Sequence, residues 1–267
     1  MVFHLPAGLT SGRFERRGSA EVWFSDELPD QLEELWADVL RQAPATGLQP
    51  HLCWPGDHGT PETPAAADAV RLEEVLAADF AAYREKRLPW WTAPASPPSP
   101  DDTLDDALDD VEPWPHDPGP PFESWPGLAP AGPGIGTGPD PAETAARVAV
   151  ELCHGRYAPG LGLALVPARR SADVPALVGW DHGAPVPLLT ALLRSWEERF
   201  GARVVAAYGG EVQVSVAWPP LDVGDAERLA LEHVLSTADN IVDDPPTPFP
   251  EYARGLVGRT EWRFWWD

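Results

Sequence analysis

Two runs of alternating residues, joined by Gly209-Gly210, constrain the fold of this chain more than any other feature. The second run, 211–218, places three valines and a tryptophan at every second position, with Gln213, Ser215 and Ala217 between them. A period of two puts the two sets on opposite faces of a strand, and a two-glycine link suits the tight turns of hairpins. We expect an antiparallel hairpin over 204–208 and 211–218, with the valine face buried and the other face wet or lightly covered.

Amphipathic helices are predicted on both sides of this hairpin. Over 188–200, leucines and aromatic residues recur every three or four positions, and Gly201, a residue that often ends helices, follows. Over 222–237 the apolar residues again share one side, and His233 lies on that side. The aromatic run 262–266 predicts a final strand, so the expected order is helix, hairpin, helix, strand.

Several motifs of this region resemble a bacterial family known as domain of unknown function 4253. They are the run LRSWEERFGAR at 193–203, Pro219-Pro220, Glu232-His233, Asp239-Asn240 and the terminal Trp-Trp-Asp that ends at Asp267. The resemblance covers about residues 173–267, with a weaker similarity at 47–52. Members often carry Cys-Pro before the Asp-Asn pair, where this chain has Thr237-Ala238. The family has no established activity, so the resemblance implies a fold boundary and no mechanism.

The overall charge restricts the classes of partner. The formal net charge is −23, which argues against nucleic acid and against anionic membrane surfaces, because both attract clustered Lys and Arg. We expect no nucleic-acid partner and no membrane partner. Cys53 and Cys153 form no disulfide framework, and the first 18 residues lack the apolar core of a signal peptide. These features favour an acidic, cytoplasmic protein.

The chain divides into three parts by composition. Residues 1–87 are predicted to form a strand, a helix over 29–42, a second strand over 47–54 and a helix over 65–87. We expect this unit to pack on the main body. Residues 88–141 lack Lys and Arg and are rich in Pro, Gly and Asp, which predicts an irregular acidic linker or insert that loops out. Residues 142–267 form the main domain, in which 174–180 is predicted as a strand or turn. The fold class is α+β, with a mostly antiparallel sheet, helices packed on it and a Pro/Asp-rich irregular insert.

One group of residues suggests acid–base chemistry. Glu232 and His233 lie side by side on the predicted helix, and Asp239 follows just beyond it. A histidine near a carboxylate can act as a general base. A histidine on an apolar helix face is more often a packed side chain with a satisfied hydrogen bond, and the structural interpretation is the stronger one here.

A second group suggests binding. Tryptophans on a surface mark recognition sites, whereas buried tryptophans anchor small cores, and core packing is favoured here. Trp180, Trp196 and Trp218 are candidates for the wall of a ligand pocket. The candidate binding residues are Trp180, Trp196, Trp218, Asn240, Trp262, Trp266 and Asp267.

No metal or cofactor is expected. The spacing of His51, Cys53, His58, Cys153 and His154 matches no standard zinc site. The alternating glycines near 132–138 lack the strand and the spacing of a nucleotide-binding loop.

The sequence therefore favours a non-enzymatic, intracellular protein-interaction module that binds an unidentified protein through an aromatic or acidic surface. The first alternative is a hydrolase-like enzyme that uses Glu232, His233 and Asp239. The second alternative is a small-molecule binder with a tryptophan-lined pocket.

Overall fold

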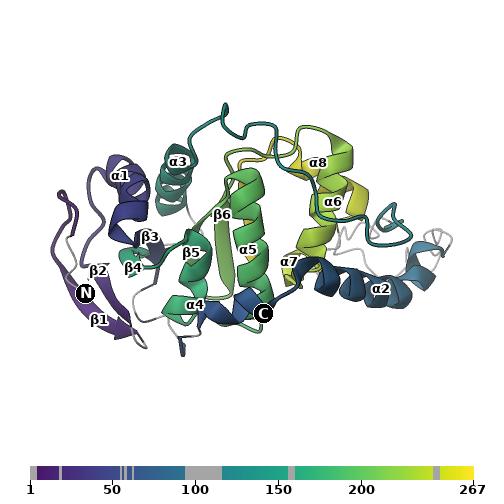
Figure 1. The fold of residues 1–267 in the computed structure, drawn as a ribbon, viewed down its shortest axis with the longest axis horizontal. Helices are drawn as coiled ribbons and strands as arrows, with labels where there is room; N and C mark the ends of the chain where they lie inside the picture. Colours follow the sequence, from purple (N-terminus) through teal and green to yellow (C-terminus); the bar gives the residue numbers. More distant parts are fainter. Residues whose placement is uncertain are drawn as a thin grey trace, which may run out of the picture.

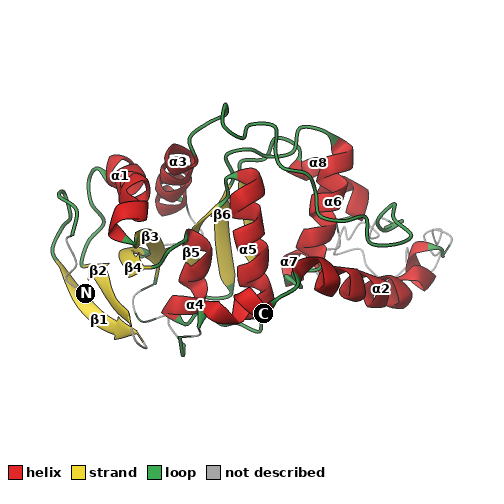
Figure 2. Cartoon of the chain, in the orientation of Figure 1, coloured by secondary structure: helices red, strands yellow, loops and turns green. Residues whose placement is uncertain are grey.

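The structure, a computed structural model, describes residues 5–17, 20–54, 56, 59–61, 63–93, 116–155, 160–242 and 247–267. Within these residues, seven strands form one sheet in the order β1-β2-β4-β3-β5-β6-β7. Neighbouring strands are antiparallel except β3 and β5, which are parallel. The predicted α+β fold with a mostly antiparallel sheet is confirmed (Figures 1 and 2).

The elements have the following bounds. The strands are β1 (Gly12–Arg17), β2 (Ala20–Ser25), β3 (Leu48–Cys53), β4 (Gly162–Pro167), β5 (Arg203–Tyr208), β6 (Glu211–Ser215) and β7 (Glu261–Trp265). The helices are α1 (Leu32–Thr46), α2 (Leu72–Trp91), α3 (Pro141–His154), α4 (Val174–Val178), α5 (Val186–Phe200), α6 (Val223–Val234), α7 (Asp239–Val242) and α8 (Phe249–Leu256). Two 3₁₀ turns, η1 (Pro64–Ala69) and η3 (Ser171–Asp173), complete the described elements.

The sheet has a hydrophobic core on each face. Val212, Val214 and Val216 are fully buried in the cluster that also includes residues of α2, α5, α6 and α8. On the opposite face, Trp23, Leu163 and other strand residues pack against α1 and α3. The predicted burial of the valine face is confirmed. The Gln213 face, predicted to be wet or lightly covered, is closed over by α3, since Gln213 is only 3% exposed.

Local sequence signals fix the ends of the main helices. Asp222 accepts a hydrogen bond from the backbone N–H of Asp225 at 3.0 Å and so caps α6. Asp140 caps α3 in the same way through Ala142. Gly201 ends α5 in the left-handed conformation, with φ of 59°, which an L side chain adopts with difficulty. The caps explain why α5 and α6 agree closely with the predicted ranges.

Several predicted elements are wrong in place or type. The helix predicted over 65–87 is split into η1 and α2, and α2 continues through Pro89 to Trp91. Residues 174–178 form α4 rather than a strand or turn. Asp239 and Asn240, which follow the predicted helix 222–237, begin a separate helix, α7. In each case tertiary packing outweighed the local signal.

Part of the predicted insert belongs to the packed body. Residues 116–140 pack along α5 and α6, and the N–H of Gly132 donates to the carbonyl of Arg199 at 2.9 Å. The glycines of this segment are required, because a Cβ on Gly132 would lie 1.8 Å from the carbonyl oxygen of Trp218. The acidic stretch 101–112 lies outside the described residues.

Candidate functional site

Glu232 is the most completely enclosed charged residue of the described chain. It lies in α6, has no exposed surface and accepts four hydrogen bonds. Oε2 accepts from Nε1 of Trp196 at 2.8 Å and from Nη2 of Arg199 at 2.5 Å. Oε1 accepts from Nη1 of Arg199 at 2.9 Å and from the N–H of Ala129 at 2.7 Å.

This set of contacts holds three separate segments together. Trp196 and Arg199 come from α5, and Ala129 comes from the segment that precedes α3. Arg199 also donates to the carbonyl oxygen of Ala129 at 2.7 Å, so both backbone groups of that residue are bonded to the ion pair. The four fixed donors stabilise the negative charge of this buried carboxylate. Because each oxygen already accepts two hydrogen bonds, neither is available to take a proton from a substrate.

His233, the next residue, is enclosed by aromatic rings. Its ring centroid lies 4.9 Å from that of Trp196, 4.7 Å from Trp262 and 4.9 Å from Phe264. Nδ1 forms a hydrogen bond of 2.9 Å with the hydroxyl of Tyr252. Nε2 is buried and has no hydrogen-bond partner in the described part of the chain. The side chain therefore fills the core beneath β7.

The surroundings of His233 keep the ring neutral. Burial lowers its pKa well below the ordinary value of 6.5, and the positive charges of Arg199 and Arg259 lower it further. A neutral imidazole without access to solvent packs as a polarisable ring. The structural interpretation of His233 thus has direct geometric support.

Asp239 and Asn240 engage the last strand instead of His233. Oδ2 of Asp239 accepts from the N–H of Asp267 at 2.8 Å. Asn240 donates to the carbonyl of Arg263 at 3.0 Å and accepts from the N–H of Trp265 at 2.8 Å. One side-chain amide thus pairs with the outward-facing backbone groups of β7 as a neighbouring strand would, and so covers the sheet edge.

The structure does not assemble the proposed acid–base group. No hydrogen bond joins Glu232, His233 and Asp239 in the described residues, and none of the three lines a cavity described below. No group of three or more His, Cys, Asp or Glu in the same residues is arranged to hold a metal ion.

The candidate tryptophans occupy three different environments. Trp196 and Trp262 are in the core, 5.6 Å apart in an edge-to-face arrangement. Trp180 and Trp266 are also buried and form a second edge-to-face pair, at 5.3 Å. Trp218 packs against the glycine segment and donates to the carbonyl of Pro139 at 3.0 Å. Trp180, Trp196 and Trp218 therefore do not line a common pocket.

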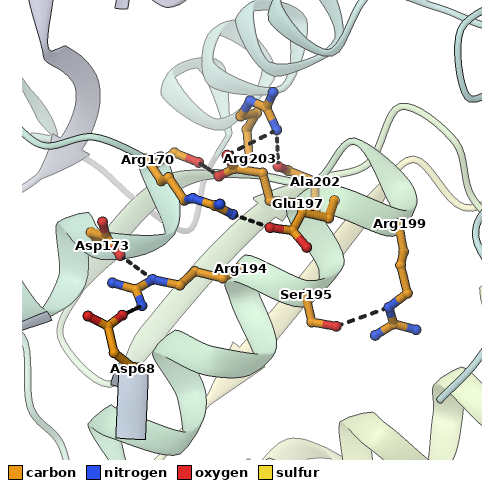
Figure 3. Close-up of polar contacts among 11 residues, drawn as sticks. Asp68, Arg170, Asp173, Arg194, Ser195, Glu197, Arg199, Ala202 and Arg203 are labelled. Carbon is orange, nitrogen blue, oxygen red and sulfur yellow. Dashed lines mark hydrogen bonds and ion pairs between the residues drawn. The ribbon is translucent and has the colours of Figure 1, made fainter. Parts of the chain in front are cut away.

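A polar cleft of about 560 Å³ lies between η1, the segment 167–173 and the outer side of α5. Arg194 lies between two carboxylates, those of Asp173 and Asp68 (Figure 3). Its guanidinium is 2.7 Å from Asp173 and 2.5 Å from Asp68. Arg170 pairs with Glu198 at 2.7 Å. Both arginines are therefore already paired with carboxylates inside the cleft, and the Arg194–Asp68 pair ties η1 to α5.

A smaller cleft of about 320 Å³, named here the aromatic cleft, was not predicted from the sequence. Its apolar wall consists of Tyr83, Trp90 and Trp91 from α2, Val234, Ile241, Phe249 and Tyr252, and its polar lining of Arg87, His116, Asp117 and Thr247. Trp90 is 62% exposed, and Tyr252 at the inner wall contacts His233. The signal in the sequence was Trp90-Trp91, which the predicted boundary at residue 88 assigned to the insert.

The hydrogen bonds of Asp117 fix one wall of the aromatic cleft. Its Oδ1 accepts from the N–H of Phe249 at 2.9 Å and from the N–H of Gly119 at 2.8 Å. Trp91 lies over Gly119, where a Cβ would approach the indole ring to 2.3 Å. The cleft is therefore built by packing between α2, the 116–119 segment and α8.

Among the described residues, no helix is long and apolar enough to span a lipid bilayer. Comparison with curated proteins and with solved structures found no match. Residues 162–267 match the family described as Domain of unknown function (DUF4253). The part of the chain that runs from β4 to Asp267, which includes the Glu232–Arg199 ion pair and the covered edge of β7, therefore belongs to the DUF4253 family.

Proposed function

We propose that this protein is a non-enzymatic, intracellular protein-interaction module whose partner inserts an apolar side chain into the aromatic cleft. The observation that carries the proposal is the exposure of Trp90 at a concave site lined by four further aromatic rings from Tyr83, Trp91, Phe249 and Tyr252. Trp, Tyr and Arg are the residues most enriched at the energetic centres of protein interfaces, and all three line this cleft.

The charge of the chain favours a protein partner over a nucleic acid. At −23, the surface repels phosphate backbones, while an apolar anchor can be bound without charge pairing. The hydrolase alternative lacks geometric support, because the carboxylate of Glu232 is fully bonded and Asp239 is bonded to the end of β7.

A small-molecule ligand in the aromatic cleft is the second candidate. The volume of about 320 Å³ falls within the range of small-ligand sites. The tryptophans concerned are Trp90 and Trp91, and not the three that were predicted to form a pocket.

Site-specific photo-crosslinking tests the proposal. The photoreactive amino acid benzoylphenylalanine replaces Trp90 in the full chain in its host, and in a matched control it replaces Leu221, which is 65% exposed and lies outside this cleft. We expect a discrete protein adduct from position 90 that is absent from position 221. Trp90→Ala should abolish co-purification of that protein and leave the melting temperature within about 2 °C, since an exposed side chain contributes little to stability.

Three results would contradict the proposed function. They are the absence of a protein adduct at position 90, an equal adduct at both positions, and retention of the partner by Trp90→Ala. Specific binding of a small metabolite without any protein adduct would favour the small-molecule candidate instead.

A further inference from the structure

A cavity of about 250 Å³ lies on the opposite face of the sheet from the aromatic cleft, under the end of α3. It is lined by Glu151, Leu152, Gly155, Tyr208, Glu211, Gln213, Glu261 and Arg263. The residues contributed by β6 and β7 are cross-strand neighbours, with Gln213 opposite Arg263. The cavity, named here the acceptor cavity, thus has a rigid sheet as its floor.

Gln213, which lines this cavity, has an unused hydrogen-bond acceptor. The residue is 3% exposed, and its Oε1 has no hydrogen-bond partner in the described chain. Its Nε2 donates to Oε2 of Glu211 at 3.2 Å. That bond fixes the orientation of the amide, because a flipped amide would place two acceptors against each other. A buried carbonyl oxygen without a donor costs free energy that a ligand N–H would recover.

The carboxylates around Gln213 favour a cationic donor. Glu211 is paired with Arg263, and its Oε2 also accepts from the hydroxyl of Tyr208 at 3.0 Å. Glu151 and Glu261 have no ion pair within the described residues. Burial is the largest cause of the raised pKa of Glu261, and the positive charge of Arg259 partly offsets it. The negative charge of Glu151 raises the same pKa further, so the two carboxylates lie close together.

We propose that the acceptor cavity binds a guanidinium group, with Gln213 Oε1 and the carboxylates of Glu151 and Glu261 as acceptors. A guanidinium presents several N–H donors in one plane, and charge-assisted hydrogen bonds to carboxylates are among the strongest in proteins. The site is separate from the aromatic cleft and does not rest on the proposed function.

A matched pair of probes tests the charge requirement. Butylguanidinium and its neutral isostere butylurea are titrated into the full-length protein at low ionic strength, and the side-chain amide signal of Gln213 is followed by NMR. We expect butylguanidinium to shift this signal saturably and butylurea to bind at least about tenfold more weakly, as expected for loss of a charge-assisted interaction. Agmatine and a short peptide with one internal arginine distinguish a free metabolite from a partner side chain.

Two variants test whether binding depends on this cavity or only on the overall negative charge of the protein. Glu261→Gln should weaken butylguanidinium binding about tenfold, whereas Glu85→Gln, on α2 and outside the cavity, should leave it unchanged. Equal loss in both variants, equal binding of butylurea, or no saturable shift at Gln213 would overturn the proposal. Arg156 follows Gly155 in the sequence and lies outside the described residues. If butylguanidinium binds only to Arg156→Ala, then the side chain of Arg156 occupies the cavity in the natural protein. That result would also overturn the proposal.

Discussion

Replacing Glu232 by Gln tests whether this residue is structural or catalytic. The change keeps the shape of the side chain but converts one carboxylate oxygen into an NH₂ group. Whichever oxygen is replaced, two of the four accepted hydrogen bonds become donor–donor contacts. Arg199, whose side chain is 14% exposed, is left without its counterion. Removal of one partner from a buried ion pair costs about 3–5 kcal/mol.

The expected result is therefore a large loss of stability. The free energy of unfolding, measured by urea denaturation with tryptophan fluorescence, should fall by about 3–5 kcal/mol, and the melting temperature by about 10 °C. Arg199→Met should cost a similar amount. The double variant should be less destabilised than the sum by at least about 2 kcal/mol, because the second change removes the charge that the first left unpaired.

Three outcomes would refute this reasoning. A cost below about 1 kcal/mol for Glu232→Gln would mean that the ion pair is not a main stabilising contact. A gain in stability would point to a strained carboxylate kept for chemistry, because functional residues are often maintained at the expense of stability. Additive effects of the two single changes would show that Glu232 and Arg199 are not coupled.

Three further predictions follow from the contacts around β7. Burial lowers the pKa of His233 in the folded protein, so as the pH decreases below about 6.5 the unfolded chain binds a proton that the folded chain excludes, and the free energy of unfolding decreases; His233→Gln should flatten this part of the profile in urea unfolding measured across pH. Asn240→Ala should lower the free energy of unfolding by about 2 kcal/mol, since two backbone groups lose their partner, and should increase self-association in sedimentation velocity because the edge is uncovered. Thr237 has a positive φ of 68°, and its Oγ1 accepts from Nε1 of Trp266 at 3.4 Å. Thr237→Gly and Thr237→Ala both lose this bond, but only Gly relieves the strain, so the Gly variant should be more stable than the Ala variant by about 1 kcal/mol; equal melting temperatures in calorimetry would contradict strain at this position.

Local sequence patterns predicted the centre of the fold well. The hairpin, α5 and α6 follow from alternation, helical spacing and the glycines at 201 and 209–210, because each of these signals acts within a few residues. The same patterns misplaced α4 and the end of α2. The predicted helix ended at residue 87, but α2 continues through Pro89 to Trp91 although the proline removes one backbone hydrogen bond. Trp91 packs against Gly119 from a distant segment, a contact that no local pattern indicates.

Long-range contacts explain why the candidate sites were not predictable. Glu232 was singled out as one member of a possible acid–base group, yet its partner Ala129 is 103 positions away in a segment predicted to loop out. The aromatic cleft combines residues from α2, the 116–119 segment, α6, α7 and α8. No periodicity within one element can indicate that such segments meet. The acceptor cavity depends on one unpaired oxygen of Gln213, which the alternating pattern placed on a wet face.

The motifs shared with the DUF4253 family lead to one conclusion about where function lies. Trp196 and Arg199 of the LRSWEERFGAR run hold Glu232 of the Glu-His pair, while Asp239 and Asn240 hold the end of the terminal aromatic strand. These motifs therefore bind one another and have few groups left for a ligand. The aromatic cleft, by contrast, takes much of its lining from α2 and residues 116–117, outside the matched range 162–267. If the proposed function holds, the matched range supplies the framework and part of the cleft, and residues that precede it supply the remaining surface for a partner.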